Sequence, residues 1–513
     1  MEQPTAVMSR QPGRSPGGAG RPGTADGDAG RPGLHPLREP RGLTQGMRIR
    51  RAATLLVLTV LLPGSAQLAA GDRRIGRIAL RGWLAAVATV ALVGLLWAVH
   101  RPWALSLATT PLVLSLLAVA LHAAALAWPL LLVDAWRLGR PAALPRRARG
   151  WIGATAFGLV LLTAVPSVAL GRRAWAAGDL IGSVFDGSSS SAAVDGRYTV
   201  LLLGCDAGPD RVGTRPDSIT LASIDASTGR TVLFSLPRNL ENVPLPPGTP
   251  AAAALPGGWS CGDDCLLNGF YTWGAEHRTA FPGAADPGAA AMKQAVEGIT
   301  GLKVNYYVLI DLKGFRQLID AMGGVRVTVG ERVAIGGGTS RVKGWIEPGT
   351  RTLNGYDALW FARSRHGADD YARMQRQRCV MDAMVRQMEP GTLLRNFQQV
   401  AAAGKQVVST DLPAAELGTF LDLGARAKSQ RITSVQFVPP LVRPAYPDYG
   451  LIRQRVAAAV AASQAAPDGP APAAPARRAP ASPGSGETPG ATAPPGRGAG
   501  PDGDDVRAAC SPA

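Results

Sequence analysis

Long apolar runs dominate the first third of the chain. Residues 82–99 and 151–171 contain no charged side chain, and residues 104–133 contain no Asp, Glu, Lys or Arg. Each run can cross a hydrocarbon core of about 30 Å at about 1.5 Å per helical residue, so we expect three transmembrane helices. Tryptophans near the ends of these runs are typical of the membrane–water interface; they are Trp83, Trp97, Trp103 and Trp151.

A fourth apolar run, residues 52–71, is interrupted near its middle by Pro63 and Gly64, which break helices. Arginines cluster in residues 72–81 and 134–150, and the positive-inside rule places both loops in the cytoplasm. The fourth run then begins and ends on the cytoplasmic side. This pattern favours a re-entrant or shallow hairpin rather than a crossing.

Three spans from an inside N-terminus leave everything after residue 171 outside the membrane. Four spans with the N-terminus outside give the same location for the rest of the chain. Four spans with the N-terminus inside would instead leave it in the cytoplasm. We therefore expect a multi-pass protein of the cell membrane with an extracellular domain.

After residue 196 the pattern becomes that of a globular domain. Residues 197–204 form an apolar run that ends at a glycine, residues 218–225 alternate, and residues 231–236 follow a turn, which predicts three strands with a hairpin. Further strands are expected at 304–310, 325–329 and 431–438, and helices at 286–299, 311–322, 353–364, 370–388, 413–427 and 450–464. Interleaved strands and helices predict an α/β fold, a mixed central sheet flanked by helices, over residues 197–465.

The two ends lack apolar periodicity. The N-terminal end, residues 1–47, is rich in Gly, Pro and Arg, and the C-terminal end, residues 466–513, is rich in Pro, Ala and Gly. Such compositions are typical of disordered, solvated tails. Residues 172–196 are expected to form a linker that leaves the membrane. The predicted order is therefore a cytoplasmic tail, a transmembrane region over residues 52–171, the linker, the domain and a second tail.

The formal net charge of +17 is compatible with nucleic acid, anionic lipid or acidic polymer as a partner. An extracellular location and the lack of a stacked-aromatic platform disfavour nucleic acid. No glycine-rich nucleotide-binding motif is present. The two histidines of the domain, His277 and His366, form no catalytic triad pattern.

Cysteine spacing disfavours a zinc site, because Cys261 and Cys265 have no second Cys or His pair at the spacing of a zinc finger. In an extracellular domain, one disulfide among Cys261, Cys265 and Cys379 is compatible with the sequence. The alternative is that these cysteines are reduced, structural thiols.

Two carboxylates lie where predicted strands end. Asp206 follows the first strand and Asp217 precedes the second. If these strands are neighbours, both side chains lie at one sheet edge, and two carboxylates there suit Mg²⁺, which shares oxygen ligands with substrate phosphates. The alternative is that each Asp is an ordinary turn or cap residue.

A second group consists of arginines. On a helix beginning near Asp370, Arg373, Arg376 and Gln377 share one face, and Asp370 can brace Arg373. Three more arginines lie at the ends of other predicted elements: Arg238 follows the third strand, and Arg363 and Arg365 lie at the end of the helix before residue 370. Guanidinium groups hold phosphate oxygens in pairs and stay charged. A solvated basic face is the alternative, but Phe361, Met374 and Met381 are interleaved with these arginines, which favours an anion site.

At these residues the chain resembles the LytR-CpsA-Psr family, and the resemblance covers roughly residues 197–390. It is carried by the order and spacing of Leu201-Leu-Leu-Gly-Cys-Asp206, Arg215-Pro-Asp217-Ser-Ile-Thr, Ser235-Leu-Pro-Arg238, Leu267-Asn-Gly-Phe-Tyr271, Asn305-Tyr-Tyr-Val-Leu-Ile-Asp311, Gly323-Gly-Val-Arg-Val, Leu353-Asn-Gly-Tyr-Asp-Ala-Leu-Trp-Phe-Ala-Arg363-Ser-Arg365 and Asp370-Tyr-Ala-Arg373-Met-Gln-Arg376-Gln377. The multi-pass N-terminus and the Arg-Gln-Arg-Cys379 ending look like an actinobacterial branch. The family pattern differs at Asn239, where an Asp is usual, and at Pro216, where a small residue is usual.

The resemblance implies transfer of a polyprenyl-pyrophosphate-linked glycopolymer onto peptidoglycan, with a new phosphodiester and release of polyprenyl phosphate. It implies that Asp206 and Asp217 hold Mg²⁺ (or Mn²⁺), and it makes Asp206 the candidate for taking the proton of the acceptor hydroxyl. The residues implied to clamp the pyrophosphate are Arg238, Arg363, Arg365, Arg373, Arg376 and Gln377. No side-chain nucleophile is needed, because positioning and electrostatics carry phosphoryl transfer.

Two alternatives use the same residues. A polyprenyl-pyrophosphate pyrophosphatase would replace the acceptor hydroxyl with water. A non-catalytic protein would bind the polyprenyl lipid and act as a regulator, although the intact pair of Asp206 and Asp217 disfavours it.

Overall fold

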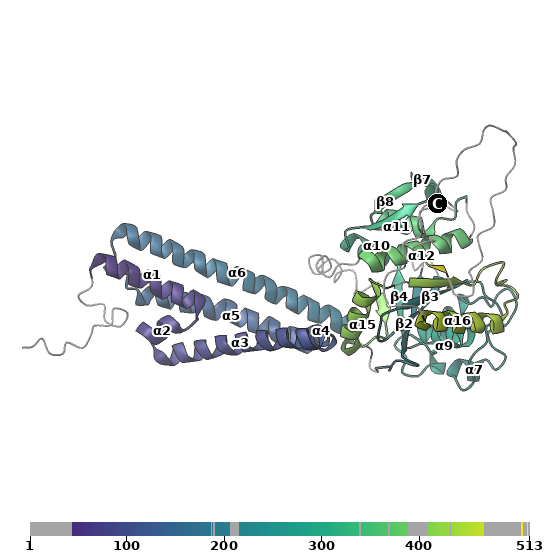
Figure 1. The fold of residues 1–513 in the computed structure, drawn as a ribbon, viewed down its shortest axis with the longest axis horizontal. Helices are drawn as coiled ribbons and strands as arrows, with labels where there is room; N and C mark the ends of the chain where they lie inside the picture. Colours follow the sequence, from purple (N-terminus) through teal and green to yellow (C-terminus); the bar gives the residue numbers. More distant parts are fainter. Residues whose placement is uncertain are drawn as a thin grey trace, which may run out of the picture. The chain divides into compact units, whose positions relative to one another are not determined.

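The computed structural model describes residues 44–185, 187, 190–205, 215–337, 340–367, 370–387, 408–430, 432–465, 504–505 and 510 (Figure 1). These residues belong to two compact units, Met1–Gly82 with Leu130–Leu159, and Trp83–Pro129 with Val160–Ala513. The globular domain lies entirely within the second unit.

The N-terminal part of the described chain is helical. Its helices are α1 (Gln45–Leu61), α2 (Ser65–Ala70), α3 (Arg73–Val99), α4 (Arg101–Thr109), α5 (Pro111–Leu138) and α6 (Arg146–Val184). Within the described residues, three stretches are long and apolar enough to cross a membrane: Arg73–Val99, Pro111–Ala143 and Arg146–Val184. The three apolar runs of the sequence lie in these stretches, apart from the first residues of the second run.

Proline and glycine explain where these helices break. The run at 52–71 divides into α1 and α2, and Gly64 between them has φ 93°. A Cβ at Gly64 would lie 2.5 Å from the Gly76 carbonyl oxygen, so only glycine fits this turn. The run at 104–133 divides at Thr110, because a residue before proline is disfavoured in the helical region. Helix α6 continues to Val184, into the expected linker.

A mixed seven-stranded sheet forms the centre of the domain, in the order β11-β10-β3-β2-β1-β4-β9. Its strands are β1 (Arg197–Cys205), β2 (Pro216–Asp225), β3 (Thr231–Leu236), β4 (Tyr306–Asp311), β9 (Val408–Thr410), β10 (Ile432–Gln436) and β11 (Asp504–Asp505). Strands β1, β2 and β3 run antiparallel in succession, whereas β1 pairs with β4 and β3 with β10 in parallel. The predicted mixed sheet is confirmed.

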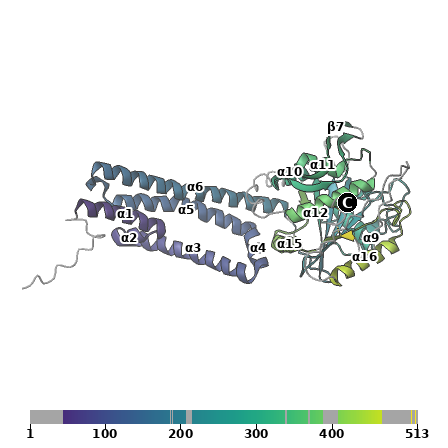
Figure 2. The ribbon, with the colours of Figure 1, turned by 45° about the horizontal axis from the view of Figure 1, so that its top comes forward.

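Helices cover both faces of this sheet. Both views show α9 (Pro287–Thr300) and α16 (Tyr449–Ala465) on one side, and α10 (Leu312–Ala321), α11 (Gly355–Arg363) and α12 (Asp370–Gln387) on the other (Figures 1 and 2). Side chains alternate along each strand. Leu201 and Leu203 are buried in the core with α9 and α16, whereas Leu202 points to the opposite face.

The remaining described elements surround this sandwich. They include three helices, α7 (Pro250–Ala254), α8 (Gly269–Glu276) and α15 (Ala414–Ala427). Two antiparallel strand pairs complete them, β5 (Val325–Val329) with β8 (Gly349–Leu353) and β6 (Val333–Gly337) with β7 (Ser340–Ile346). The second pair packs on α11 through Val333 and Ile346. A smaller core joins β5, β6, β7 and β8 to helices α10, α11 and α12.

Two disulfides are present. Cys261 is bonded to Cys265, one of the pairings that the sequence left open. Cys379 on α12 is bonded to Cys510, 131 residues later, and Asp504 and Asp505 pair with β10. The prediction of a tail over 466–513 did not include this attachment, because a short strand and a lone cysteine leave no periodic signal in the sequence.

Candidate functional site

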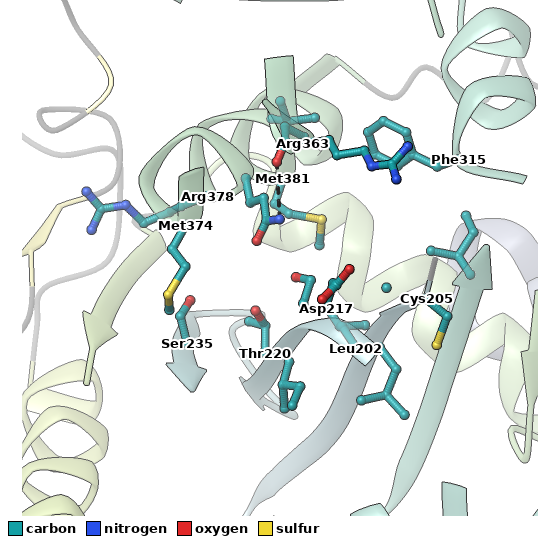
Figure 3. Close-up of a pocket in the computed structure, with 18 of the residues that line it drawn as sticks. Leu202, Cys205, Asp217, Thr220, Ser235, Phe315, Arg363, Met374, Arg378 and Met381 are labelled. Atoms are coloured by element: carbon teal, nitrogen blue, oxygen red, sulfur yellow. Dashed lines mark hydrogen bonds between the residues drawn. The ribbon is translucent and has the colours of Figure 1, made fainter. Parts of the chain in front are cut away.

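A cavity of about 250 Å³ lies between the sheet and helix α12 (Figure 3). Its floor comes from β1, β2, β3 and β4, and its roof comes from α10, α11 and α12. Most of the lining is apolar, including Leu202, Leu233, Val308, Ile310, Phe315, Leu318, Met374, Met381 and Met384. The flexible methionines suit an apolar ligand of variable shape.

Asp217 and Arg238 form a polar pair in the wall of this cavity. Strands β2 and β3 are antiparallel, so the start of β2 and the end of β3 lie at the same sheet edge. Asp217 is the second residue of β2, and Arg238 follows β3 by two residues. The Arg238 Nη1 group donates to Asp217 Oδ1 at 2.7 Å. The pairing of β2 with β3 therefore brings Asp217 and Arg238 together at one edge of the sheet.

Further arginine–carboxylate contacts extend from Asp217. Arg365 Nη2 lies 3.9 Å from Asp217 Oδ1, and Arg365 Nε lies 3.1 Å from Asp370 Oδ1. Asp370 in turn accepts a 2.8 Å hydrogen bond from Arg373 Nη2. The predicted brace between Asp370 and Arg373 is confirmed. The chain of contacts joins β2, the loop after α11 and the first turn of α12.

Arg363, the last residue of α11, also lines the cavity. Its guanidinium carbon lies 5.6 Å from the centre of the Trp360 ring. Figure 3 shows the Arg363 guanidinium beside Phe315, whereas the Arg378 guanidinium is turned to the opposite side. The described residues thus place Arg238, Arg363 and Arg373 around one cavity, with Arg365 paired to its wall.

Two predicted members of the clamp have other contacts. Arg376 donates to the Phe361 carbonyl oxygen at 2.8 Å and to the Ser364 carbonyl oxygen. These contacts hold the C-terminal end of α11, and Arg376 is not part of the cavity lining. Gln377 does line the cavity, and its Nε2 donates to the Ala362 carbonyl oxygen at 3.2 Å.

Arg378 was not among the predicted site residues, yet it lines the cavity and is only 6% exposed. Arg378 Nη1 donates to Ser434 Oγ on β10 at 2.7 Å. One signal was present in the sequence: Arg378 is a third arginine on the same predicted helix, five residues after Arg373 and two after Arg376. Its pairing with β10 depends on a strand more than fifty residues away, which helical periodicity does not reveal.

Arg373 places a buried positive charge at the cavity. Its side chain is 3% exposed, and its buried Nε has no hydrogen-bond partner among the described residues. Burial lowers the pKa of Arg373, Asp370 beside it opposes this, and Arg365 adds to the lowering. A guanidinium nevertheless stays protonated in proteins. A buried donor without a partner is costly, so an anion bound in the cavity would stabilise this arrangement.

The predicted metal ligands lie partly outside the described residues. Asp206 is outside them, and Asp217 lines the cavity. Among the residues that the structure describes, no three His, Cys, Asp or Glu side chains gather as a metal-binding group. In the described part of the chain, both arginine contacts of Asp217 fall on Oδ1 and leave Oδ2 without an arginine partner. One or two carboxylates with substrate phosphates are the donor set typical of Mg²⁺, and one carboxylate oxygen of Asp217 is compatible with that ion.

Cys205, the last residue of β1, also lines the cavity and is 1% exposed. Burial raises the pKa of its thiol to about 12, and the carboxylates of Asp286, Asp217 and Asp311 add to the increase. A thiol with so high a pKa stays protonated near neutral pH. Cys205 is therefore an apolar part of the floor and is not suited to act as a nucleophile.

Comparison with known proteins agrees with these features. The model of the LytR_cpsA_psr family matches residues 180–442. The polyisoprenyl-teichoic acid–peptidoglycan teichoic acid transferase TagU of Enterococcus faecalis is 28% identical over 219 residues, 42% of this chain and 61% of that protein. The cell wall biosynthesis protein LcpA of Corynebacterium glutamicum is 29% identical over 244 residues, 43% of this chain and 45% of that protein. The chain thus spans about half to two thirds of these relatives' length.

A solved structure with similarity to this chain is that of the LytR-CPS2A-psr family protein YwtF (TagT) with bound octaprenyl pyrophosphate lipid. It is 20% identical, covers 54% of this chain and 93% of that chain, and superposes with a TM-score of 0.34. The family match extends over just more than half of the 513 residues and includes the arginine cluster and every strand of the sheet except β11. The chain belongs to the LytR_cpsA_psr family.

Proposed function

We propose that this protein transfers a glycan from a polyprenyl pyrophosphate carrier onto peptidoglycan. The observation that carries the proposal is the meeting of Arg238, Arg363 and Arg373 at an apolar cavity, with a buried guanidinium donor still unpartnered. A polyprenyl pyrophosphate has the matching chemistry, a dianionic or trianionic head on an apolar tail. The transferase activity named for TagU supports the same reaction class.

In the proposed reaction, a hydroxyl oxygen of peptidoglycan attacks the phosphorus atom that carries the glycan. A new P–O bond forms, the bond to the bridging oxygen breaks, and polyprenyl phosphate leaves with that oxygen. The hydroxyl proton passes to a base, for which Asp206 remains our candidate. The arginines neutralise charge that grows on the leaving phosphate, and such preorganised charge is a major source of catalysis.

The other residues have supporting roles in this proposal. Asp217, with Asp206, would hold Mg²⁺, which when bound neutralises phosphate charge. Asp217 also orients Arg238, and Asp370 orients Arg365 and Arg373. Arg376 acts as a positioning residue, because its bonds to the end of α11 fix the segment that carries Arg363 and Arg365. Gln377 adds a polar group to the wall.

The orientation of the chain is part of the proposal. Peptidoglycan lies outside the cytoplasmic membrane, so the domain after α6 must lie outside for transfer to occur. The arginine-rich loops at residues 72–81 and 134–150 support this orientation through the positive-inside rule.

The test uses full-length protein in lipid nanodiscs, polyprenyl pyrophosphate with and without an attached glycan, and peptidoglycan. We expect Arg238→Ala and Arg363→Ala to reduce transfer by about 10²-fold or more. Arg351→Ala is the matched control, because this exposed arginine on β8 bonds only to backbone oxygens nearby in the described contacts. Full transfer activity in both cavity variants would refute the proposal.

The same assay separates transfer from hydrolysis. Transfer leaves one phosphate in the link between glycan and peptidoglycan, whereas a pyrophosphatase releases inorganic phosphate from the carrier without a glycan. Release of inorganic phosphate at an unchanged rate when peptidoglycan is added would favour the pyrophosphatase.

A further inference from the structure

Trp345 presents a partly exposed aromatic ring on the hairpin that packs on α11. It lies on β7, and 37% of the residue is exposed. Its neighbour Ile346 is 5% exposed and packs in the core with α11 and α12. Because successive side chains of a strand point to opposite faces, Trp345 lies on the face of the β6–β7 hairpin away from that core.

Neighbouring residues fix the orientation of this ring. The guanidinium carbon of Arg332 lies 4.1 Å from the ring centre, and Arg332 is also paired with Glu347 at 3.5 Å. The His366 ring approaches at 5.6 Å between ring centres, with its plane at 67°. Ala334, directly opposite Trp345 in the hairpin, is fully buried. These contacts hold the indole in place, and 37% of the residue stays exposed.

The ring is linked to the charged site through the loop after α11. His366 follows Arg365, so their Cα atoms are about 3.8 Å apart, and Arg365 is paired with Asp217 and Asp370. The hairpin contacts this loop closely, because a Cβ at Gly337 would lie 2.9 Å from the Cβ of His366. The hairpin that carries the indole therefore contacts the loop that holds Arg365.

We propose that Trp345, braced by Arg332 and His366, binds a sugar ring of the glycan beside the pyrophosphate site. This inference rests on the proposed function, in which the glycan leaves the cavity at its charged end. A pyranose ring has a face of C–H groups that packs on an indole, while its hydroxyl groups stay hydrated or contact Arg332. A rigid aromatic ring offers this contact at little cost in conformational entropy.

Single exposed apolar residues are common on proteins and need no ligand. Trp345 differs because a cation, a second ring and a buried strand partner hold it on a hairpin that contacts the loop carrying Arg365. The sugar ring comes either from the glycan on the carrier or from the acceptor peptidoglycan. Both are pyranose rings, so the chemistry of recognition is shared and the experiment separates the two sources.

The experiment measures binding to full-length protein in lipid nanodiscs with three ligands. They are bare polyprenyl pyrophosphate, the same lipid carrying a disaccharide, and soluble glycan-strand fragments of peptidoglycan. The variants are Trp345→Ala and Trp345→Phe, with Tyr446→Ala as control, because Tyr446 is an aromatic residue 85% exposed on another loop. Thermal unfolding of each variant checks that it folds.

We expect Trp345→Ala to weaken the binding of one sugar-bearing ligand by about tenfold. Trp345→Phe should retain most of the affinity for that ligand. Both variants should bind the bare lipid as the wild type does. Weaker binding of the disaccharide lipid alone shows that Trp345 contacts the glycan of the donor. Weaker binding of the glycan strand alone shows that it contacts the acceptor. Equal effects on all three ligands, or on none, overturn the inference. Failure of the wild type to bind bare lipid would instead count against the proposed function.

Discussion

The Arg238 guanidinium donates a 2.7 Å hydrogen bond to Asp217 and so joins the end of β3 to the start of β2. Two strands that are neighbours in the sheet thus bring opposite charges from separate sequence motifs to one edge. Asp217 has two roles in the proposed site. It keeps Arg238 and Arg365 in place, and it offers its second oxygen to a cation.

Replacing Asp217 tests both roles. We expect Asp217→Asn to reduce transfer by about 10- to 100-fold, because the amide weakens the charge-assisted bond to Arg238 and is a poor ligand for Mg²⁺. Stability should change by only about 0–1 kcal/mol, since both side chains are partly exposed. Transfer kinetics and urea unfolding measure the two effects. Asp263→Asn, at an exposed carboxylate, is the control, and an unchanged rate in Asp217→Asn would argue against its role.

Removal of Mg²⁺ gives a second prediction. Chelation should abolish transfer by the wild type, and added Mg²⁺ or Mn²⁺ should restore it, because a divalent cation neutralises the pyrophosphate. The Asp217→Asn variant should need more Mg²⁺ for half-maximal restoration. Isothermal titration of Mg²⁺ in the presence of bare polyprenyl pyrophosphate provides a readout independent of turnover. Full transfer after exhaustive chelation would exclude the predicted metal.

The orientation in the membrane is directly measurable. Alkaline phosphatase fused after residue 190 should be active in cells, since the enzyme folds only outside the cytoplasm and α6 is expected to carry the chain across. A fusion after residue 140, in the arginine-rich loop, should be inactive and serves as the control. An inactive fusion at residue 190 would support the four-span arrangement with a cytoplasmic domain.

Cys205 should resist alkylation in the folded protein. All five cysteines lie among the described residues, and the other four form disulfides, so mass spectrometry reports on one thiol. Burial raises the pKa of Cys205 to about 12, so iodoacetamide at pH 8 should label it only after unfolding, because the thiolate is the reactive form. Rapid labelling of the native protein would contradict this.

The same pKa shift predicts a pH dependence of stability. The folded state keeps the Cys205 proton to higher pH than the unfolded state does, so its contribution is complete below the ordinary thiol pKa. It is lost as pH rises from that value towards about 12. Cys205→Ala should reduce the loss of stability over this window in alkaline unfolding experiments, and an identical alkaline profile would argue against the shift.

The two disulfides should contribute unequally to stability. The bond between Cys379 and Cys510 closes a long loop, with a sequence separation of 131, whereas Cys261 and Cys265 are separated by four. Loop entropy predicts that Cys379→Ser with Cys510→Ser costs about 2–5 kcal/mol, more than Cys261→Ser with Cys265→Ser. Thermal midpoints of the two double variants measure this, and a larger loss from the short loop would contradict the entropic argument.

Local patterns were sufficient for most of the fold. Apolar runs and alternation predicted β1, β2, β3 and β4 and the helices α9, α11 and α12 within a few residues, because strand and helix periods follow from local backbone geometry. Short elements such as β9 and β11 were missed. Their few residues carry no period, and they form only because a longer strand offers unpaired backbone groups.

The sequence by itself determined the apolar segments, the α/β class and the set of arginines available for an anion site. Only the tertiary structure decided that Arg376 holds the end of α11, that Arg378 lines the cavity, and that Cys510 reaches α12. Side-chain direction on a helix can be predicted from spacing, but its partner depends on which distant strand packs against it. Such contacts are set by packing across the whole domain, which no local pattern records.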